Sequence, residues 1–321
     1  MGSDHGFAVG DTDVMSVLVA RREAGSRPGA RDDPHRVALV VEGGGMRGVY
    51  GAGMVRALAG LGLRDSLDEV MAVSAGALAG AALVIGNTAG LPAVYHEDLC
   101  DRAFIDLRRG LQSTRAVVSL DFLFETVMRG RHGFDPGDLI DSDIPLRPVA
   151  TVLDQLHGRT LDGMTSADEW RLALRASACI PLWAGPPVEL HGRRLVDGYV
   201  SDPLPVVRAI DGGATHVLVL LARGTAEQVP PSTRVSPILR SRLDRLSPGL
   251  AALMSLRGHR HAEAMAVVSG RVRRGATRVL GVRPWGGGGI RSLTTDPRRL
   301  RLGGEAGEAA VHRAVALVPG V

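Results

Sequence analysis

The chain has 321 residues, of which 45% are apolar and 22% are charged, so it is long enough to bury a large hydrophobic core. Its formal net charge is +4, and the sequence contains no lysine, so all 38 of its Lys and Arg residues are arginine. Only 3% of the residues are aromatic, which argues against a nucleic-acid-binding protein, and the 42 glycines show no period of the kind found in fibrous or solenoid proteins.

The cysteines and the N-terminus indicate the expected compartment. Cys100 and Cys179 are isolated, so they neither build a disulfide framework nor match the spacing of metal ligands. The first residues are acidic where a signal peptide needs basic ones, and the apolar stretch 72–85 is too short to span a bilayer. We expect a soluble, cytoplasmic protein. Because arginine pairs well with phosphate, peripheral contact with a membrane is compatible with this sequence.

The spacing of apolar residues predicts helices and strands that alternate along the chain. Helices are expected at 13–25, 47–60, 75–85, 121–135 (a helix and a turn), 166–181, 223–275 (helical and rich in arginine) and 304–318. Strands are expected at 36–41, 69–73, 147–161 (a strand and its exit), 187–206 (a hairpin that turns near Gly192), 214–222 and 277–285 (a final edge strand).

This alternation predicts a three-layer α/β/α body with a largely parallel central sheet. Residues 1–35 are interpreted as an N-terminal arm and linker. Residues 36–210 are expected to form the catalytic core, and residues 211–321 to complete the same α/β domain.

A run of glycines follows the first long strand. Gly43, Gly45 and Gly48 satisfy the pattern G-x-G-x-x-G between a strand and a helix, as dinucleotide binding requires. That function also needs an acidic residue at the end of the second strand, where Ser74 stands instead; Glu69 lies at the start of that strand. A nucleotide-dependent oxidoreductase is therefore poorly supported.

Ser74 lies where a serine hydrolase places its nucleophile. The segment from Ala72 to Gly76 is a strand–serine–helix turn with small residues two positions before and after the serine. Ala72 replaces the first glycine of the usual G-x-S-x-G pattern, which is a difference of one methyl group. The N-terminus of the following helix favours negative charge at the serine oxygen.

A serine nucleophile needs a base. Six of the ten histidines lie at linkers, turns, strand ends or in an arginine-rich helix, and each is interpreted as solvated or structural; they are His35, His157, His191, His216, His259 and His261. Asp197 differs because a strand ending in apolar residues delivers it to a turn at Gly198. Its carboxylate is expected to take the serine proton directly if the two oxygens are within ~2.6–3.2 Å.

The segments "EGGGMRG", "AVSAG" and "VDG", in this order, resemble the motifs of the patatin-like phospholipases. The stretch "RASACIPLWAGPPVEL" is also similar to the Ala-Ser-x-x-x-Pro stretch of that family. The resemblance covers about 37–206 and implies a patatin-like α/β/α fold and an acyl hydrolase with a Ser-Asp dyad.

The resemblance also implies roles for individual residues. Ser74 would be the nucleophile and Asp197 the base, while the backbone N–H groups of 43–45 would form the oxyanion hole. The remaining motif positions are Arg47, Gly48 and Ala75 around the substrate, and Ala72, Gly76 and Gly198 as supporting residues. For Arg47, fixing the loop, contacting a lipid phosphate and forming a structural salt bridge all remain open.

Two departures from the family pattern concern side chains near the site. Glu42 replaces the usual aspartate before the glycines, and this side chain is not expected to take part in the chemistry. Tyr199 stands where a small residue usually follows Asp-Gly, and it is expected to narrow the pocket.

The function favoured by the sequence is cleavage of phospholipid or other acyl esters through an acyl-serine intermediate, without metal or cofactor. Acyl transfer or thioester cleavage by the same dyad, and a non-catalytic protein that binds lipid or acyl groups, remain alternatives. The glycines at 286–289 are expected in a mobile surface loop, and the arginines at 234–274 on a solvated helical face.

Overall fold

The computed structural model describes residues 3–111, 116–225, 227, 234–286 and 289–320. Its centre is a ten-stranded sheet with the order β1-β2-β10-β9-β3-β4-β5-β8-β7, and β6 pairs with β5. The five strands from β10 to β5 in this order are mutually parallel. The strands are β1 (Ser3–Asp4), β2 (Ala8–Gly10), β3 (Val37–Val41), β4 (Glu69–Val73), β5 (Leu146–Val152), β6 (His157–Thr160), β7 (Val188–Leu190), β8 (Arg193–Asp197), β9 (His216–Leu220) and β10 (Arg278–Val282).

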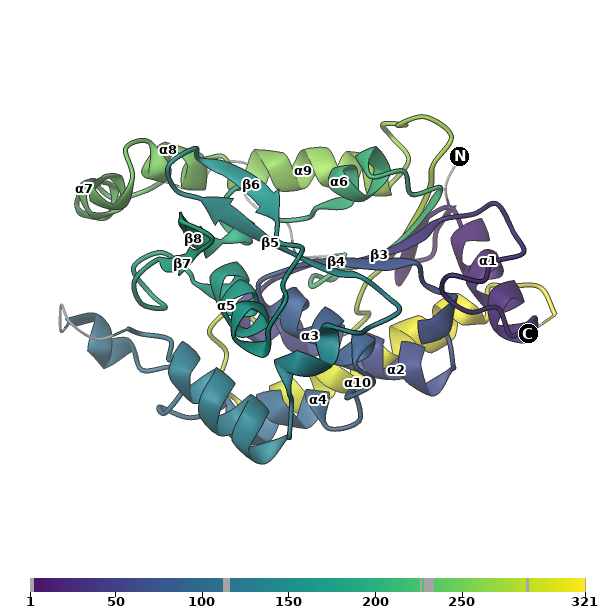
Figure 1. The fold of residues 1–321 in the computed structure, drawn as a ribbon, viewed down its shortest axis with the longest axis horizontal. Coiled ribbons are helices and arrows are strands. Elements are labelled where there is room, and N and C mark those ends of the chain that lie inside the picture. Colours follow the sequence, from purple (N-terminus) through teal and green to yellow (C-terminus); the bar gives the residue numbers. More distant parts are fainter. Residues whose placement is uncertain (1–2, 112–115, 226, 228–233, 287–288, 321) are drawn as a thin grey trace.

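Helices cover both faces of this sheet (Figure 1). The α-helices are α1 (Asp13–Glu23), α2 (Gly48–Gly60), α3 (Ala75–Val84), α4 (Leu91–Ala93), α5 (Ala167–Ala178), α6 (Val206–Asp211), α7 (Pro237–Leu246), α8 (Leu250–Ser255), α9 (Arg257–Val268) and α10 (Pro297–Val315). Two π-helices, Val94–Asp98 and Phe122–Arg131, and short 3₁₀ helices such as Leu107–Leu111 complete the connections. The expected three-layer α/β/α architecture with a largely parallel sheet is confirmed.

The central strands are apolar on both faces, because a parallel sheet is covered by helices on each side. In β3, Val37, Leu39 and Val41 belong to the larger core beneath α2, α3 and α10. Ala38 and Val40 point to the opposite face and join the core with α6 and α9. Every residue of β3 is therefore buried, as its unbroken apolar sequence requires.

The helix predicted for the N-terminal arm forms α1, and Arg21 anchors it. This buried guanidinium forms ion pairs with Asp33 at 2.8 Å and with Asp68 at 2.7 Å. N-terminal and C-terminal segments meet in the sheet, since β2 pairs with β10, β10 pairs with β9, and β9 pairs with β3. The division into an arm, a core and a completing part stays a prediction.

Two strand predictions need correction. The segment 277–285 was expected to form an edge strand, but β10 has neighbours on both sides because β2 pairs with it. The exit of the strand in 147–161 is itself a strand, β6, which folds back antiparallel on β5. In both cases the additional strand is only three or four residues long, which is too short to give a recognisable period.

Candidate active site

The glycine run lies against the turn that carries Ser74. A Cβ atom at Gly43 would lie only 2.7 Å from the Ser74 Cβ and from the Val73 carbonyl oxygen. A Cβ at Gly44 would lie 3.0 Å from the Arg47 Cβ, and Gly45 has a positive φ of 59°. Side chains are absent here because the backbone must approach the serine closely.

Ser74 occupies a strained turn between β4 and α3. Its φ of 56° and ψ of −130° are rare for a residue with a side chain. The helix begins at Ala75, and a Cβ at Gly76 would lie 2.5 Å from the Val41 carbonyl oxygen. Ala72 is fully buried within β4, so the methyl group that replaces the usual glycine is accommodated.

The sheet register brings Asp197 to this serine. In β5, Val149 pairs with Val73 of β4, and the next residue, Ala150, pairs with Asp197 of β8. Ser74 Oγ donates a hydrogen bond of 2.7 Å to Asp197 Oδ2. The second carboxylate oxygen accepts the Tyr199 N–H at 2.8 Å.

Gly198 makes the turn after Asp197 possible. A Cβ at this position would overlap the Val149 carbonyl oxygen in β5, so only glycine fits without displacing the backbone. The predicted Asp-Gly pair therefore has a physical basis in the packing of β8 against β5.

Burial raises the pKa of Asp197 to about 7, although the hydrogen bonds from Ser74 and Tyr199 act in the opposite direction. Ser74 and Asp197 are 5% and 2% exposed, so little water reaches the carboxylate. A pKa near neutrality suits a general base, because such a group both accepts and returns a proton at moderate cost.

Backbone N–H groups beside the serine are available to a ligand. Within the described residues, those of 43–45 and Ala75 donate to no protein acceptor. The next one, Met46 N–H, is already bonded to the Ser292 carbonyl oxygen at 3.1 Å. These free donors and the N-terminus of α3 give the site a local excess of positive potential.

Ser177, near the end of α5, supports the nucleophile, and the sequence analysis gave it no role. Its Oγ accepts the Ser74 N–H at 3.0 Å and donates to the Val149 carbonyl oxygen at 2.7 Å. The side chain therefore ties the strained turn to β5. The quoted Ala-Ser stretch contained the signal, since Ser177 is its serine.

Glu42 organises the outer side of the glycine run. One oxygen accepts the Ala222 N–H at 2.7 Å, and the other contacts Arg223 and His261, the latter at 3.1 Å. Burial alone would raise the pKa of the Glu42 carboxyl, but Arg223, His261 and the Ala222 N–H together lower it to about 2. His261 is only 8% exposed, which agrees with a structural role and not with a solvated one.

Two further side chains near the site are Arg47 and Tyr199. Arg47 forms no ion pair with any described residue, and its structural salt bridge stays a prediction; among these residues its buried Nε has no partner, and its side chain lies over Gly44. Burial and the neighbouring Arg223 lower the Arg47 pKa. Tyr199 does not line the apolar pocket, because its hydroxyl bonds to Arg223 at 2.7 Å on the outer side of the site.

An apolar pocket of about 50 Å³ begins at Ser74. Its wall comes largely from the mixed segment 87–145, for which the sequence predicted only a helix and a turn at 121–135; the structure has the π-helix Phe122–Arg131 there. The residues that line the pocket are Gly45, Met46, Ser74, Ala75, Leu78, Leu91, Val94, Tyr95, Leu99, Phe104, Val118, Leu120, Leu123, Met128, Ala178 and Ile180. Gly48 lacks a side chain because a Cβ there would overlap the Tyr95 hydroxyl of this wall.

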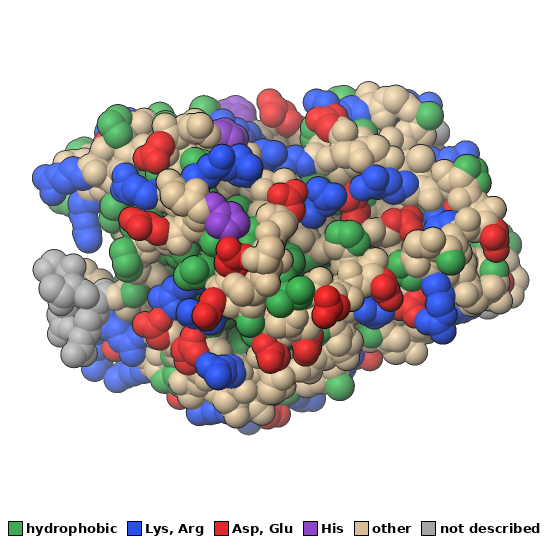
Figure 2. Space-filling model, viewed as in Figure 1, with side chains coloured by type: hydrophobic (Ala, Val, Ile, Leu, Met, Phe, Trp, Pro, Cys, Tyr) green, Lys and Arg blue, Asp and Glu red, His purple; other side chains and the backbone are tan. Residues whose placement is uncertain are grey.

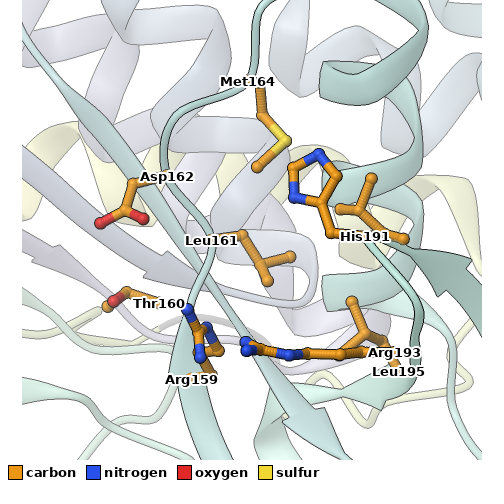
Figure 3. Close-up of a pocket in the computed structure, with 9 residues that line it drawn as sticks. Arg159, Thr160, Leu161, Asp162, Met164, His191, Arg193 and Leu195 are labelled. Carbon is orange, nitrogen blue, oxygen red and sulfur yellow. The ribbon is translucent and has the colours of Figure 1, made fainter.

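A second hollow, of about 120 Å³, lies on the edge strands and includes neither Ser74 nor Asp197. Arg159 and Arg193 extend toward each other across it, with Leu161 behind them (Figure 3). Because neither the serine nor the aspartate lines this hollow, we assign it no part in the chemistry at Ser74.

The loop that contains the glycines 286–289 is only partly described. Gly287 and Gly288 lie outside the described residues, whereas Ile290 is buried and its N–H contacts the Tyr50 hydroxyl at 3.4 Å. Ser292 in turn holds Met46, so the end of this loop packs against the glycine run.

Across the described residues, no group of three or more His, Cys, Asp or Glu side chains is placed to hold a metal ion. In the same part of the chain, the helices are too short or too polar to cross a bilayer.

Comparison with known proteins shows similarity to a family, to a protein sequence and to a solved structure. Residues 39–210, more than half of the chain, match the family model described as patatin-like phospholipase. The uncharacterized protein YjjU of Escherichia coli strain K12 is 29% identical over 189 residues, which are 58% of this chain and 52% of YjjU, so the chain matches about half of that relative. VipD from Legionella pneumophila is 13% identical with a TM-score of 0.47, over 88% of this chain and 67% of VipD.

Proposed function

The chain belongs to the patatin-like phospholipase family, which implies a lipid acyl hydrolase, and we propose that Ser74 and Asp197 form its catalytic dyad. The observation that carries this proposal is the 2.7 Å hydrogen bond from Ser74 Oγ to Asp197 Oδ2 on a strained turn beside free backbone donors. The substrate is a phospholipid or another acyl ester met at a membrane surface.

In the first step, Ser74 Oγ attacks the ester carbonyl carbon while its proton passes to Asp197 Oδ2. The carbonyl oxygen becomes an oxyanion and is stabilised by the N–H groups of 43–45 and Ala75. Each such preorganised donor is worth ~3–4 kcal/mol in a site that excludes water. The acyl chain lies in the apolar pocket that begins at the serine.

Collapse of the tetrahedral intermediate breaks the bond to the alcohol, which leaves with the proton from Asp197. An acyl-serine ester remains on Ser74. Water then gives a proton to Asp197 and attacks the acyl carbon, and the second collapse releases the fatty acid as Ser74 Oγ regains its proton. Asp197 acts as base and then as acid in each half of the cycle.

The dyad is tested by hydrolysis of p-nitrophenyl butyrate with the wild type, Ser74→Ala and the nearly isosteric Asp197→Asn. Both variants should lose about 10³-fold or more of kcat, since residues that act as one unit lose nearly all activity singly. Ser241→Ala, which removes an exposed serine of α7, is the matched control and should keep full activity.

Thermal unfolding checks that each variant is folded. Undiminished turnover by a folded Asp197→Asn variant would reject the aspartate as the base. A fluorophosphonate probe supplies a second readout. It should label the wild type fully, Asp197→Asn at most weakly, and Ser74→Ala not at all. Labelling of another serine would move the nucleophile elsewhere.

A further inference from the structure

A group of arginines is exposed on α7 and the residue stretch before it. The α7 surface consists of Arg234, Ile238, Arg240, Arg242 and Arg245, all of which are exposed. The opposite side of the helix packs into a small core through Leu239, Leu243 and Leu246. Basic side chains gather over α7 at one end of the molecule (Figure 2).

The four arginines of the α7 surface have no acidic partner among the described residues. Asp244, the one acid of this helix, accepts the Ala251 N–H at 3.1 Å instead. On α10, in contrast, Arg301 pairs with Glu305 at 2.9 Å. A solvated helical face commonly alternates charges of both signs, whereas the α7 surface presents a single sign to solvent.

Large apolar side chains are exposed at the same end of the molecule. Ile238 is 77% exposed within the α7 surface, and Leu107, in the 3₁₀ helix Leu107–Leu111, is 61% exposed. The helix Leu107–Leu111 and α7 lie at the same end of the long axis (Figure 1). Arg108, beside Leu107, is also exposed and has no ion pair in the described part of the chain.

The loop after α5 connects this end of the molecule to the apolar pocket. Ile180 lines the pocket, Leu182 packs against the core beneath α7, and Trp183 is 36% exposed. The Trp183 carbonyl oxygen accepts the N–H of Val118, another residue of the pocket wall. The loop after α5 therefore contacts both the core beneath the α7 surface and the wall of the pocket that would hold the acyl chain.

We infer that the α7 surface, with Leu107 and Trp183, binds an anionic lipid bilayer and presents the pocket of Ser74 to it. Unpaired arginines are attracted to anionic headgroups, and exposed Ile, Leu and Trp side chains insert at the boundary between headgroups and acyl chains. An anionic bilayer is inferred as the partner because its charge is complementary to that of the α7 surface. That the bilayer also supplies the substrate rests on the proposed function.

The test measures co-sedimentation with vesicles of phosphatidylcholine alone and of phosphatidylcholine with 30% phosphatidylglycerol. A Ser74→Ala background prevents hydrolysis. The triple variant R240E/R242E/R245E should bind the anionic vesicles at least tenfold more weakly and should lose most of the salt dependence. Ile238→Ser should weaken binding by a smaller factor and leave the salt dependence unchanged.

The matched control is R271E/R273E/R274E, which reverses three exposed arginines in the loop after α9. That loop lies at the other end of the molecule from α7 (Figure 1), so binding should change less than twofold. The same substitutions in the Ser74 enzyme should leave hydrolysis of p-nitrophenyl butyrate unchanged, which separates the surface from the dyad.

Three results would overturn the inference: equal loss in both triple variants, equal binding to neutral and anionic vesicles, or tighter binding of single-stranded DNA than of vesicles through the same arginines. Vesicle binding that fails while esterase activity persists would reject the surface alone. Activity that is absent while binding persists would instead reject the proposed function.

Discussion

Asp197 has a buried carboxyl whose only direct partners, within the part of the chain that the structure describes, are a hydroxyl and one backbone N–H. No cation contacts it among the described residues, so burial dominates and its pKa rises to about 7. A Ser-Asp dyad needs this isolation, since an aspartate with its ordinary pKa would be too weak a base for a serine hydroxyl.

This pKa predicts the pH dependence of catalysis. Below pH 7 the carboxyl is protonated and cannot take the Ser74 proton, so kcat/KM should fall about tenfold per pH unit and level off above about pH 8. The measurement is kcat/KM for an ester without ionisable groups between pH 5 and 9. A constant rate from pH 5 to 8 would contradict the prediction.

The same shift has an opposite effect on stability. The folded-state pKa of Asp197 lies above the ordinary aspartate pKa of 3.8, so the folded protein holds this proton more tightly than the unfolded chain. Its contribution to the free energy of unfolding is present below about pH 4 and is lost as the pH rises to about 7. As the pH rises toward about 7, the Asp197 carboxyl thus becomes able to accept a proton while it ceases to stabilise the fold.

The elements around Ser74 could be predicted because each motif is local. The glycine run, the serine turn and the Asp-Gly turn each depend on backbone contacts that small residues alone permit, and these residue types are visible in the sequence. Ser177 acts through Val149, 28 positions away, and Arg223 through Glu42, 181 positions away. The local sequence contains the Ala-Ser stretch and the glutamate before the glycines, but it does not indicate which residues these side chains contact.

The wall of the apolar pocket was missed for a different reason. The segment 91–128 contains π-helical turns and irregular connections, which lack the regular 3.6-residue period that predicts a helix. The first part of this segment, α4 and the π-helix Val94–Asp98, instead packs on α10, and α4 also contacts α2. The mixed composition of this segment predicted only a helix and turn at 121–135, and no pocket wall.

The size of this pocket predicts the preferred acyl length. A cavity of about 50 Å³ holds only a few water-sized groups at roughly 10–15 Å³ each, so butyryl and hexanoyl esters should be cleaved faster than decanoyl esters. Leu123→Ala, which shortens a wall residue, should raise the decanoate-to-butyrate ratio of kcat/KM at least fivefold.

Val127→Ala is the matched control for this change. Val127 lies on the same π-helix and is fully buried, but it does not line the pocket. It should cost stability without altering the acyl preference. An unchanged ratio in a folded Leu123→Ala variant would mean that the acyl chain does not enter this pocket.

At the scale of the whole molecule, the last helix supports the first part of the site. α10 crosses α2, the helix that starts directly after the glycine run, and the two backbones meet without side chains between them. A Cβ at Gly53 would overlap the Gly304 carbonyl oxygen, and one at Gly307 would overlap the Tyr50 carbonyl oxygen. Residues more than 240 positions apart thus fix the helix that carries the glycine run.

This crossing predicts that Gly307→Ala destabilises the protein although alanine favours helices. The added methyl group would meet rigid backbone, and overpacking of this kind costs about 1–3 kcal/mol, more than the gain of ~0.5–1 kcal/mol in helix propensity.

Thermal unfolding should show a lower Tm for Gly307→Ala and an unchanged or slightly higher Tm for Gly60→Ala, because a Cβ at Gly60 in α2 meets no atom within 4 Å. Since α2 begins beside the oxyanion donors, Gly307→Ala should also lower kcat for p-nitrophenyl butyrate while Gly60→Ala does not. Equal Tm values for the two variants would show that α2 and α10 can move apart without cost. The proposal that α10 supports the site through α2 would then be rejected.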